Sequence, residues 1–255
     1  MVRITIKNLS KKFDRIAAVN SLYLSVEDGE FFVLVGPNGC GKTTLLKLIA
    51  GLLKPDEGEI YFDNLLVNDL KPPERGVRMV FEGYALFPHM KVYEEMRYSN
   101  LNFALKVRKT KIEKIRNVIN AVSSRVGIER KLYNRKPDEL SQGEKQKVAV
   151  GKAITILPKV FLMDEPVSNL DPSTRIHVMQ ELRRLHEDLK TTTIYVTHNL
   201  AEAMVIADRL AVMMDGAIRQ VGAPDEVRNH PIDESVADFI KYYDYASLLR
   251  AFNKA

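Results

Sequence analysis

The amino-acid sequence predicts an α/β fold with a helical lobe inserted into it, and three observations lead to this prediction. Short apolar runs typical of strands alternate with segments of helical periodicity. A glycine-rich loop follows one of these runs and precedes a helix pattern. From about Tyr93 to Leu157, apolar residues recur at helical spacing among many charges, with little sign of strand, which indicates a separate helical lobe.

The composition is that of a globular protein. The chain has 255 residues, of which 45% are hydrophobic and 28% charged, and this suits one large domain or two closely associated lobes. The net charge of +5 permits an anionic partner without requiring one. Cys40 stands alone, so an internal disulfide is excluded and a reducing compartment fits. We expect no secretory signal, because the N-terminus alternates apolar and polar residues and lacks an apolar h-region. We expect no membrane span, because no run of about 18 apolar residues is present.

The first third of the chain predicts strands and one helix. Arg3–Lys7 alternates between apolar and polar residues, and Leu22–Val26 forms a second short strand. Phe31–Val35 is a continuous apolar run, as expected of a strand buried on both faces. The glycine-rich loop follows, and then a helix pattern at Thr43–Leu53 that closes near Gly51.

The rest of the chain continues this alternation. Further strands are predicted at Ile60–Phe62, Val77–Phe81, Val160–Met163, Thr193–Thr197 and Leu210–Met214. Helices are predicted at Lys145–Leu157, Thr174–Leu189, Leu200–Ala207, Asp225–Asn229 and Ser235–Phe252. Strands that alternate with helices imply a sheet with parallel members.

The loop Gly36–Thr43 has the spacing G-x-x-x-x-G-K-[ST] of a phosphate-binding loop, with a strand before it and a helix after it. Its glycines let backbone N–H groups turn toward phosphate oxygens, and the helix N-terminus adds its positive dipole end. Lys42 can bridge the outer phosphates of a nucleotide, and the Thr43 hydroxyl can bind Mg²⁺. The loop therefore predicts nucleotide binding.

Cys40 lies inside this loop and has two interpretations. A helix N-terminus can lower the pKa of a thiol, which would make Cys40 reactive. A lone thiol seldom does chemistry without a histidine partner, so we favour a small side chain that fills the loop.

Two carboxylates and one histidine follow predicted strands. Asp164 and Glu165 end the strand at Val160–Met163, where ligands of an open α/β sheet bind. Asp164 can hold the Mg²⁺ shell, and Glu165 can orient and deprotonate an attacking water. His198 follows Thr193–Thr197 at the same sheet edge and can sense the phosphate. A solvated strand end and a structural histidine are the alternatives.

The segment Leu140–Glu144, taken with these motifs in this order, resembles the signature L-S-G-G-Q of ATPase subunits of ABC transporters, over residues 1 to about 240. The resemblance implies a P-loop NTPase (RecA-like) core with an N-terminal antiparallel β-subdomain and an inserted α-helical subdomain. The implied boundaries are 1–84 and 159–222 for the core with its β-subdomain, 85–158 for the helical subdomain with the signature motif, and 223–255 for a C-terminal helical tail.

The resemblance also implies a role for individual residues. The catalytic residues are Glu165, His198 and Lys42, and Mg²⁺ is held by Thr43, Glu82 and Asp164. Phe13 stacks on the adenine ring, and the loop residues that bind ATP are Gly36, Pro37, Asn38, Gly39, Cys40, Gly41, Lys42, Thr43 and Thr44. Glu82, Ser141, Gly143 and Asp171 complete the nucleotide site. Ser141 and Gly143 contact ATP held by the other subunit of a head-to-tail dimer, and Asp171 ends a loop that crosses the dimer interface.

The function implied by the resemblance is ATP hydrolysis that drives solute import. Tyr84–Met90 and Asp215–Pro224 resemble importer ATPases for sugars, polyamines and inorganic anions, which often carry a further β-rich regulatory domain. We expect that domain to be absent or severely reduced here. The implied partners are an integral membrane permease and a second ATPase subunit, in an ATP-dependent homodimer. The implied location is cytoplasmic, peripheral on the inner face of the membrane, and no nucleic acid is expected as a partner.

Two other functions stay open. One is a soluble ABC ATPase that acts on nucleic acid, ribosomes or cofactor assembly, although its usual long insertions or tandem cassettes are not seen. The other is a regulatory nucleotide-binding subunit with little turnover. Intact Lys42, Asp164, Glu165 and His198 oppose the second, whereas two departures from the family pattern support it.

Those departures are Glu82 and Glu144, each of which stands where the family usually has glutamine. Glu82 can bind Mg²⁺ through a hard oxygen but cannot donate a hydrogen bond to water unless protonated, so we expect hydrolysis or coupling to be retuned. Glu144 suits the first turn of a helix, and we expect it to point away from the partner's γ-phosphate. Gly151 is expected to weaken its helix by about 1 kcal/mol relative to alanine.

Two surface segments have alternative interpretations. The apolar residues of Tyr84–Met90, namely Tyr84, Leu86, Phe87 and Met90, form either a groove for a membrane subunit or part of the helical lobe's own core. Lys106–Arg116 holds six Lys or Arg residues, which face nucleic acid or lipid headgroups in one interpretation and solvent in the favoured one.

Overall fold

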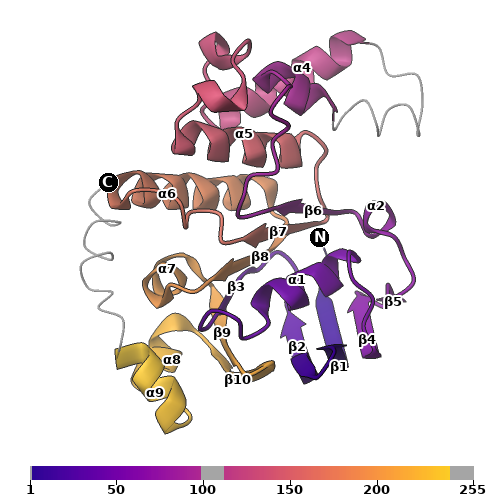
Figure 1. Ribbon diagram of the computed structural model, residues 1–255, viewed down its shortest axis with the longest axis vertical. Helices are drawn as coiled ribbons and strands as arrows, with labels where there is room; N and C mark the ends of the chain where they lie inside the picture. The colour runs from indigo at the N-terminus through magenta and orange to yellow at the C-terminus, as the bar shows by residue number, and fades with distance from the viewer. Residues whose placement is uncertain (1, 99–111, 242–255) are drawn as a thin grey trace. The chain divides into compact units, whose positions relative to one another are not determined.

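The structure is a computed structural model that describes residues 2–98 and 112–241 (Figure 1). The chain divides into two units, each described here by itself. The first unit comprises residues 1–79, 159–165 and 186–255, and the second comprises 80–158 and 166–185. The domain boundaries expected from the sequence stay a prediction.

A six-stranded sheet organises the first unit, in the order β10-β9-β3-β8-β7-β6 (Figure 1). Its strands are β3 (Phe31–Val35), β6 (Val77–Val80), β7 (Val160–Asp164), β8 (Thr192–Thr197), β9 (Arg209–Met214) and β10 (Ala217–Gly222). β3 pairs in parallel with β8 and β9, and β7 pairs in parallel with β8. Every residue of β3, β7 and β8 is buried, and burial on both faces explains the unbroken apolar sequence of β3 and the apolar run Val160–Met163 of β7. In β8 the buried residues include Thr192, Thr193 and Thr197.

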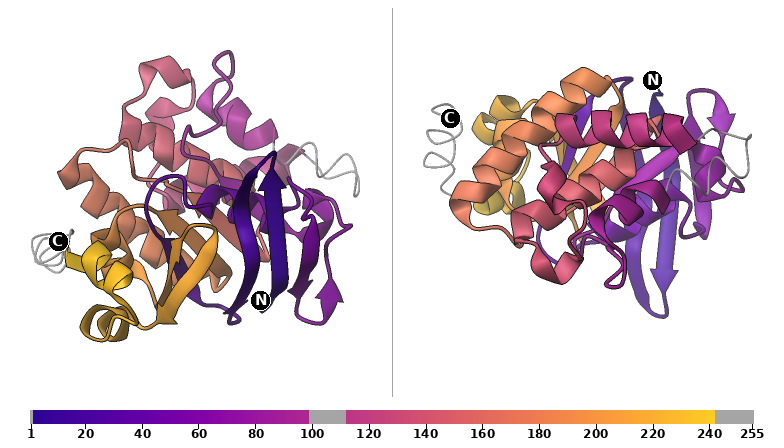
Figure 2. Two further views of the ribbon diagram at one scale, coloured as in Figure 1. Left: turned by 60° about the horizontal axis from the view of Figure 1, so that its bottom comes forward. Right: turned by 90° about the horizontal axis from the view of Figure 1, so that it is seen from above.

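The first unit also contains an antiparallel sheet in the order β2-β1-β4-β5 (Figure 2, left). Its strands are β1 (Ile4–Phe13), β2 (Ile16–Val26), β4 (Glu57–Phe62) and β5 (Leu65–Leu66). At the start of β1 alternate residues are buried, so the alternation in the sequence marks the two faces of a half-buried strand. The antiparallel β-subdomain of the predicted fold is therefore present.

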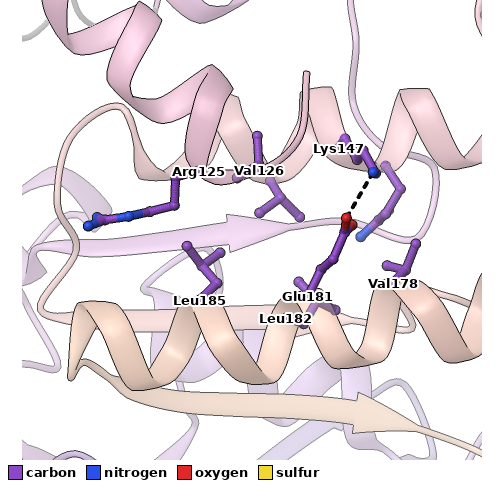
Figure 3. A pocket seen from close by; sticks show the side chains of 9 residues that line it. Arg125, Val126, Lys147, Val178, Glu181, Leu182 and Leu185 are labelled. Atoms are coloured by element: carbon purple, nitrogen blue, oxygen red, sulfur yellow. Dashed lines mark hydrogen bonds and ion pairs between the residues drawn. The ribbon is translucent and has the colours of Figure 1, made fainter. Parts of the chain in front are cut away.

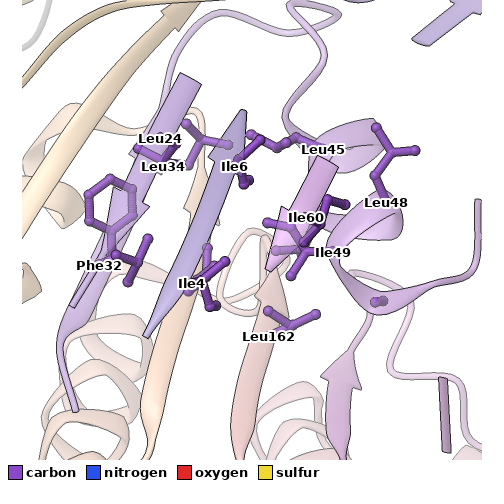
Figure 4. Packing of buried hydrophobic residues seen from close by; sticks show 14 of the residues in the cluster. Ile4, Ile6, Leu24, Phe32, Leu34, Leu45, Leu48, Ile49, Ile60 and Leu162 are labelled. Carbon is purple, nitrogen blue, oxygen red and sulfur yellow. The ribbon is translucent and has the colours of Figure 1, made fainter. Parts of the chain in front are cut away.

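Helix α1 (Lys42–Ala50) packs its apolar face into the core of the first unit. Figure 4 shows Leu45 and Ile49 of α1 close to Ile6 and Ile60 of the antiparallel sheet. All four side chains are buried, so α1 is held firmly where it follows the glycine-rich loop. The other helices of this unit are α2 (Pro72–Arg75), α7 (Leu200–Ile206), α8 (Pro224–Asn229) and α9 (Glu234–Lys241).

The second unit is helical. Its helices are α4 (Ile112–Arg125), α5 (Gln142–Ile154) and the part of α6 (Pro172–Leu189) that ends at residue 185, and residues 92–98 are also helical. Short 3-10 turns lie at Arg130–Leu132 and Pro137–Glu139. An ion pair of 2.9 Å joins Lys147 of α5 to Glu181 of α6, beside a small cavity lined by apolar side chains such as Val178 and Leu182 (Figure 3).

Gly151 of α5 has a packing reason that the sequence did not reveal. A Cβ atom at this position would lie 3.1 Å from Ile128 Cδ1 and 3.3 Å from Met96 Cε. Glycine therefore lets neighbouring side chains approach the helix closely. The loss in helix propensity expected from the sequence is offset by contacts that a larger residue would crowd.

The structure differs from the sequence prediction at the ends of several elements and in three short elements that were not predicted. β1 and β2 are longer than predicted, the helix predicted to reach Leu53 ends at Ala50 before Gly51, and β5, β10 and α2 were not predicted. β10 follows a two-residue turn, Asp215-Gly216, in which both residues have positive φ angles of 49° and 77°. Asp-Gly between apolar runs is a strong hairpin signal, so the sequence held enough information to predict β10.

Parts of three predictions lie outside the described residues. The structure describes the basic segment Lys106–Arg116 only from residue 112 onward. It describes the predicted tail helix at Ser235–Phe252 only up to residue 241. Residues 99–111 of the predicted helical lobe also lie outside the described residues. Within 2–98 and 112–241, no helix is both long and apolar enough to cross a membrane.

Candidate active site

The glycine-rich loop between β3 and α1 is tightly enclosed by the first unit. A Cβ atom at Gly41 would overlap the carbonyl oxygen of Ala18 on β2, and Gly41 has a φ of 107°. A Cβ atom at Gly36 would overlap the carbonyl oxygen of Met213 on β9. These two positions accept only glycine, because backbone from two other strands occupies the space of a side chain. The strands thereby fix the curvature of the loop.

Lys42 is folded over the inside of this loop. Its Nζ donates hydrogen bonds to the carbonyl oxygens of Gly36, at 2.9 Å, and Pro37, at 2.8 Å, and the side chain is buried. A buried ammonium group is costly unless it is well hydrogen-bonded, and here the loop's own carbonyls provide the bonds. The positive charge is thus held at the place where the sequence predicts phosphate groups.

The side chains of Thr43 and Asp164 lie in contact, although 121 positions separate them in sequence. The Thr43 hydroxyl in the first turn of α1 donates to Asp164 Oδ1 at the end of β7, over 2.9 Å. Asp164 is buried. A hydroxyl and a carboxylate are hard oxygen donors of the kind that Mg²⁺ uses together with nucleotide phosphates, so this pair fits the predicted metal.

Glu165 and His198 also lie in contact, with 2.7 Å between Glu165 Oε2 and His198 Nδ1. Glu165 has a left-handed backbone with a φ of 46°, and its N–H donates to the carbonyl of Val196 over 3.0 Å. A non-glycine residue in this region is strained by about 1–3 kcal/mol, and such strain often marks functional sites. The first unit thus assembles Lys42, Thr43, Asp164, Glu165 and His198 along one set of strand ends and the adjoining loop.

Cys40 is a buried side chain of the loop. Burial raises the pKa of its thiol, against the weaker opposing effect of the Lys42 charge, whose Nζ lies 3.9 Å from Sγ. A thiol with a raised pKa is a poor nucleophile at neutral pH. The structure therefore supports the small loop-filling residue over the reactive thiol.

Phe13 and the exposed end of the loop remain accessible. Phe13 is the last residue of β1 and its ring is exposed, with Lys11 Nζ 5.7 Å from the ring centroid. Pro37, Asn38 and Gly39 are exposed, and Thr44 is half-buried in α1. An exposed aromatic face can stack on a planar base, but adenine stacking by Phe13 stays a prediction.

In the second unit, Ser141 begins helix α5 in a reciprocal capping arrangement. Its hydroxyl accepts a hydrogen bond from the N–H of Glu144 over 3.3 Å, and the Glu144 carboxylate accepts one from the N–H of Ser141 over 2.8 Å. The hydrogen bond from the Ser141 backbone lowers the pKa of Glu144. Glu144 is therefore turned back onto its own helix terminus, a capping box that the spacing S-x-x-E could have revealed.

Gly143 and Asp171 lie near the starts of α5 and α6 in the same unit. A Cβ at Gly143 would lie 3.1 Å from Thr174 Cγ2. Asp171 Oδ1 accepts from the N–H of Thr174, at 3.1 Å, and from the N–H and hydroxyl of Ser173, at 3.1 and 2.6 Å. Hydrogen bonds from Ser173 and Thr174 hold the pKa of Asp171 well below its usual range. This capping role is additional to the nucleotide role predicted from the sequence.

Glu82 is exposed in the second unit, and its backbone carbonyl accepts a hydrogen bond from Asn169 Nδ2 over 3.4 Å. Two consecutive left-handed residues follow shortly after it, Tyr84 with φ 62° and Ala85 with φ 48°. Their side chains cannot stabilise this conformation by themselves. Contacts from elsewhere must therefore hold the segment in place.

Those contacts come from Lys152 and Glu95, which the sequence analysis did not identify. Lys152 Nζ donates to the Ala85 carbonyl over 2.9 Å and forms an ion pair of 2.7 Å with Glu95 Oε2. Glu95 accepts the N–H of Phe87, and Lys152 Nζ lies 4.5 Å from the Phe87 ring centroid. Glu95 is 0% exposed. We name this arrangement, consisting of Glu95, Lys152 and the Ala85–Phe87 backbone, the loop anchor.

The apolar residues of Tyr84–Met90 are only partly shielded from solvent. Phe87 is exposed, whereas Tyr84, Leu86 and Met90 are half-buried. Burial raises the pKa of the Tyr84 hydroxyl. These residues therefore contribute partly to the packing of their own unit while leaving some apolar surface accessible, so the choice between a groove and a core stays open.

Comparison with known proteins decides the family. Residues 19–168, more than half of the chain, match the sequence family described as ABC transporter.

The chain belongs to the ABC transporter family.

Its relatives are ATP-binding proteins of uptake systems. The cassette is 49% identical to the osmoprotective compounds uptake ATP-binding protein of Synechocystis sp., over 94% of this chain and 64% of that protein. It is 46% identical to the trehalose/maltose import ATP-binding protein of Thermococcus litoralis, again over 94% and 64%. The cassette thus spans somewhat less than two thirds of the length of both relatives.

Solved structures of ABC cassettes share the fold. A nucleotide-free ATP-binding cassette from an ABC transporter matches with a TM-score of 0.81 and 27% identity, over 94% of this chain and 98% of that one. A dimeric cassette in a post-hydrolysis state, bound to ADP and Pi, matches with a TM-score of 0.76 and 31% identity, over 87% and 98%. The predicted family and fold class are confirmed.

Proposed function

We propose that this cassette is the ATP-binding subunit of an ABC transporter and hydrolyses ATP at a head-to-tail dimer interface to drive solute import through a separate membrane subunit. The observation that carries the proposal is the assembly of Lys42, Thr43–Asp164 and Glu165–His198 around one loop. This set combines a phosphate-binding cation, a pair of metal ligands and a candidate base, which are the parts that phosphoryl transfer needs.

ATP binding is assigned to the loop and its neighbours. The backbone N–H groups of Gly36–Thr44 surround the phosphates, and Lys42 exchanges its bonds to the Gly36 and Pro37 carbonyls for bonds to phosphate oxygens. Phe13 stacks on the adenine ring. The exchange is favourable because a phosphate is a stronger acceptor for an ammonium group than a neutral carbonyl.

Mg²⁺ is assigned to Thr43, Asp164 and Glu82. The first two already lie within hydrogen-bonding distance of each other, and their hydroxyl and carboxylate oxygens suit a hard cation. When bound, Mg²⁺ neutralises charge on the β- and γ-phosphates. Glu82 would add a second carboxylate, which favours metal binding but leaves no side-chain donor for the attacking water.

Water activation is assigned to Glu165 with His198. Glu165 accepts a proton as the water attacks the γ-phosphorus, and ADP leaves as the terminal P–O bond breaks. His198, 2.7 Å from Glu165 Oε2, orients the carboxylate and contacts the γ-phosphate. Lys42 stabilises the charge on the transferred group.

The complete site is assigned to two copies of the chain. Ser141, Gly143 and Asp171 of one copy serve ATP bound to the loop of the other. Helix α5 begins at Gln142, directly after its cap Ser141, and the N–H groups of Gln142 and Gly143, which the capping box does not use, suit a phosphate. Support for this arrangement comes from the dimeric cassette bound to ADP and Pi, which shares 31% identity with this chain.

Import and membrane association are proposed from the relatives. Both curated relatives named above are ATP-binding proteins of uptake or import systems. We therefore assign to this chain an integral membrane permease as partner and a cytoplasmic position at the inner face of the membrane. We expect no nucleic acid among its partners.

The decisive test of nucleotide binding is a change at Lys42. Lys42→Ala removes charge-assisted hydrogen bonds to phosphate, so ATP affinity should fall by about 10- to 100-fold. Titration of a fluorescent ATP analogue into the full chain with Mg²⁺ measures this. Lys47→Ala, on the same helix α1, is the matched control and should bind as the unmodified chain does. Equal affinities for Lys42→Ala and Lys47→Ala would refute the proposed site.

Glu82→Gln tests how the unusual carboxylate affects turnover. Glutamine can donate a hydrogen bond to water and binds Mg²⁺ less strongly, so steady-state ATPase should rise by about two- to tenfold while the Mg²⁺ concentration for half-maximal rate increases. Glu113→Gln on α4, also exposed, is the control. An unchanged rate together with unchanged Mg²⁺ dependence would show that Glu82 has no part in the reaction.

A further inference from the structure

A buried carboxylate lies next to the turn that carries His198. Glu202, on α7, is 3% exposed, and its Oε2 accepts hydrogen bonds from Thr197 Oγ1 at 2.8 Å and from the Tyr195 hydroxyl at 2.9 Å. Thr197 is 2% exposed. A carboxylate this deeply buried is retained only if it is well hydrogen-bonded, and the two hydroxyls of β8 supply such bonds.

The direction of the Thr197 hydrogen bond determines what its hydroxyl can do next. A hydroxyl has one proton and two lone pairs. Because Thr197 donates its proton to Glu202, its lone pairs are available, and Oγ1 accepts the N–H of Asn199 over 3.0 Å. Thr197 and Asn199 flank His198, so one hydroxyl fixes the backbone on both sides of the histidine.

These contacts form a closed ring. Asn199 Oδ1 accepts the N–H of Ala201 and caps α7, the helix that carries Glu202. Glu202 in turn accepts the hydrogen bond from the Thr197 hydroxyl, and that hydroxyl accepts the N–H of Asn199. A closed ring of hydrogen bonds restricts each member more than separate bonds do. His198 projects from this ring with its side chain 40% exposed and its Nδ1 toward Glu165.

We propose that Glu202 is a positioning residue for ATP hydrolysis: through the Thr197 hydroxyl it fixes the turn that presents His198 to Glu165. The proposal rests on the proposed function. Glu202 is connected to the His198 turn through the Thr197 hydroxyl, which in turn accepts the N–H of Asn199. It acts on the reaction by restricting the direction of the His198 side chain, which must lie correctly before the γ-phosphate can react.

Three substitutions separate positioning from simple stabilisation. Thr197→Val keeps the shape and removes the hydroxyl, and Thr197→Ser keeps the hydroxyl. Tyr195→Phe removes a different hydrogen bond to Glu202. Both Thr197→Val and Tyr195→Phe should lower the Tm by a few degrees, as expected for one lost buried hydrogen bond. Only the first breaks the link to His198.

Only the variant that breaks the contact between Thr197 and the His198 turn should lose turnover. We expect Thr197→Val to reduce kcat about tenfold with ATP affinity within twofold of the unmodified chain, because the loop is untouched. Thr197→Ser and Tyr195→Phe should keep kcat within about twofold. Unchanged kcat in Thr197→Val, or an equal loss in Tyr195→Phe, would show that the carboxylate only stabilises the fold.

A second variant covers the case in which Thr197→Val fails to fold. Glu202→Leu removes the acceptor and should reduce kcat to the same degree. Where both single variants fold, the double variant should lose no more activity than either one, since both act through one contact. Additive losses would overturn the proposal.

A spectroscopic readout does not depend on turnover. The chain has five histidines, and the ring Cε1–H signal of His198 can be assigned by its loss in His198→Gln. Glu165→Gln should shift this signal in the otherwise unmodified chain and in Tyr195→Phe, but not in Thr197→Val. If no hydrolysis is found at all, the proposed function fails while this experiment still decides the role of Glu202. A shift that persists in Thr197→Val would refute that role.

Discussion

Glu165→Gln should reduce the rate of ATP hydrolysis by about 10²- to 10⁴-fold, the usual contribution of a general base. Glutamine has nearly the same shape but cannot take a proton from water, so the chemical step loses its acceptor. The substitution keeps the left-handed backbone and the N–H bond to the Val196 carbonyl, because neither involves the side chain. Steady-state release of phosphate by the full chain with Mg²⁺ and ATP measures the effect.

ATP binding should survive this change. Lys42 and Thr43 belong to the loop and helix α1, and the substitution alters neither. Affinity for a fluorescent ATP analogue should stay within about threefold, and ATP should accumulate without turnover in a dimer detectable by size-exclusion chromatography. Glu129→Gln, at an exposed position, is the control. Retention of more than about a tenth of the rate in Glu165→Gln would exclude this residue as the base.

Lys152→Met should lower the free energy of unfolding of the second unit by about 3–5 kcal/mol, the cost of leaving a buried charge without its partner. Glu95 is 0% exposed and the Lys152 side chain is 19% exposed, so little solvent is available to replace the ammonium group. The substitution also removes the hydrogen bond to the Ala85 carbonyl and the contact with the Phe87 ring. Urea unfolding followed by circular dichroism measures the loss.

Two control variants make this prediction specific. Lys147→Met on the same helix breaks the more exposed ion pair with Glu181 and should cost about 1 kcal/mol or less. The double variant Glu95→Gln/Lys152→Met removes both charges and should recover part of the stability lost in Lys152→Met. If Lys152→Met and Lys147→Met cost the same, the loop anchor is no stronger than a surface ion pair.

The loop anchor also bears on function, because it holds the segment that follows Glu82. Tyr84 and Ala85 adopt consecutive left-handed conformations that ordinary side chains disfavour, and Lys152 and Glu95 bind the backbone of Ala85 and Phe87. A segment fixed in this way from helix α5 moves together with that helix. We expect Lys152→Met to expose the segment to proteases as well as to destabilise the unit.

Several features could be predicted because they depend on neighbours in sequence. The phosphate loop is defined by glycine, lysine and threonine at fixed spacing, and the structure places Lys42 inside it. The unbroken apolar run of β3 is buried along its whole length, as predicted. Two further local signals were present but unused: the Asp215-Gly216 turn that forms the β9–β10 hairpin, and the Ser141–Glu144 capping box.

Other features could not be predicted, because they depend on which distant segments pack against each other. Glycine at position 151 looked unfavourable in a helix until Ile128 and Met96 were found against it. Cys40 lies at a helix N-terminus, where a lowered thiol pKa was possible, but burial has the larger effect and raises it. In both cases the local rule was correct, and a contact from a distant segment outweighed it.

By itself, then, the sequence determined the phosphate-binding loop, most of the strands and helices, and the resemblance to the family, since these follow from residue spacing along the chain. Only the tertiary structure decided which groups meet. It joined Thr43 to Asp164, Glu165 to His198, and Glu95 to Lys152. It also showed that Glu202 accepts a hydrogen bond from the Thr197 hydroxyl, a contact that the sequence analysis did not identify. The physical reason is that hydrogen bonds and ion pairs act over about 3 Å, and the packing of strands and helices, not distance in sequence, brings groups that close.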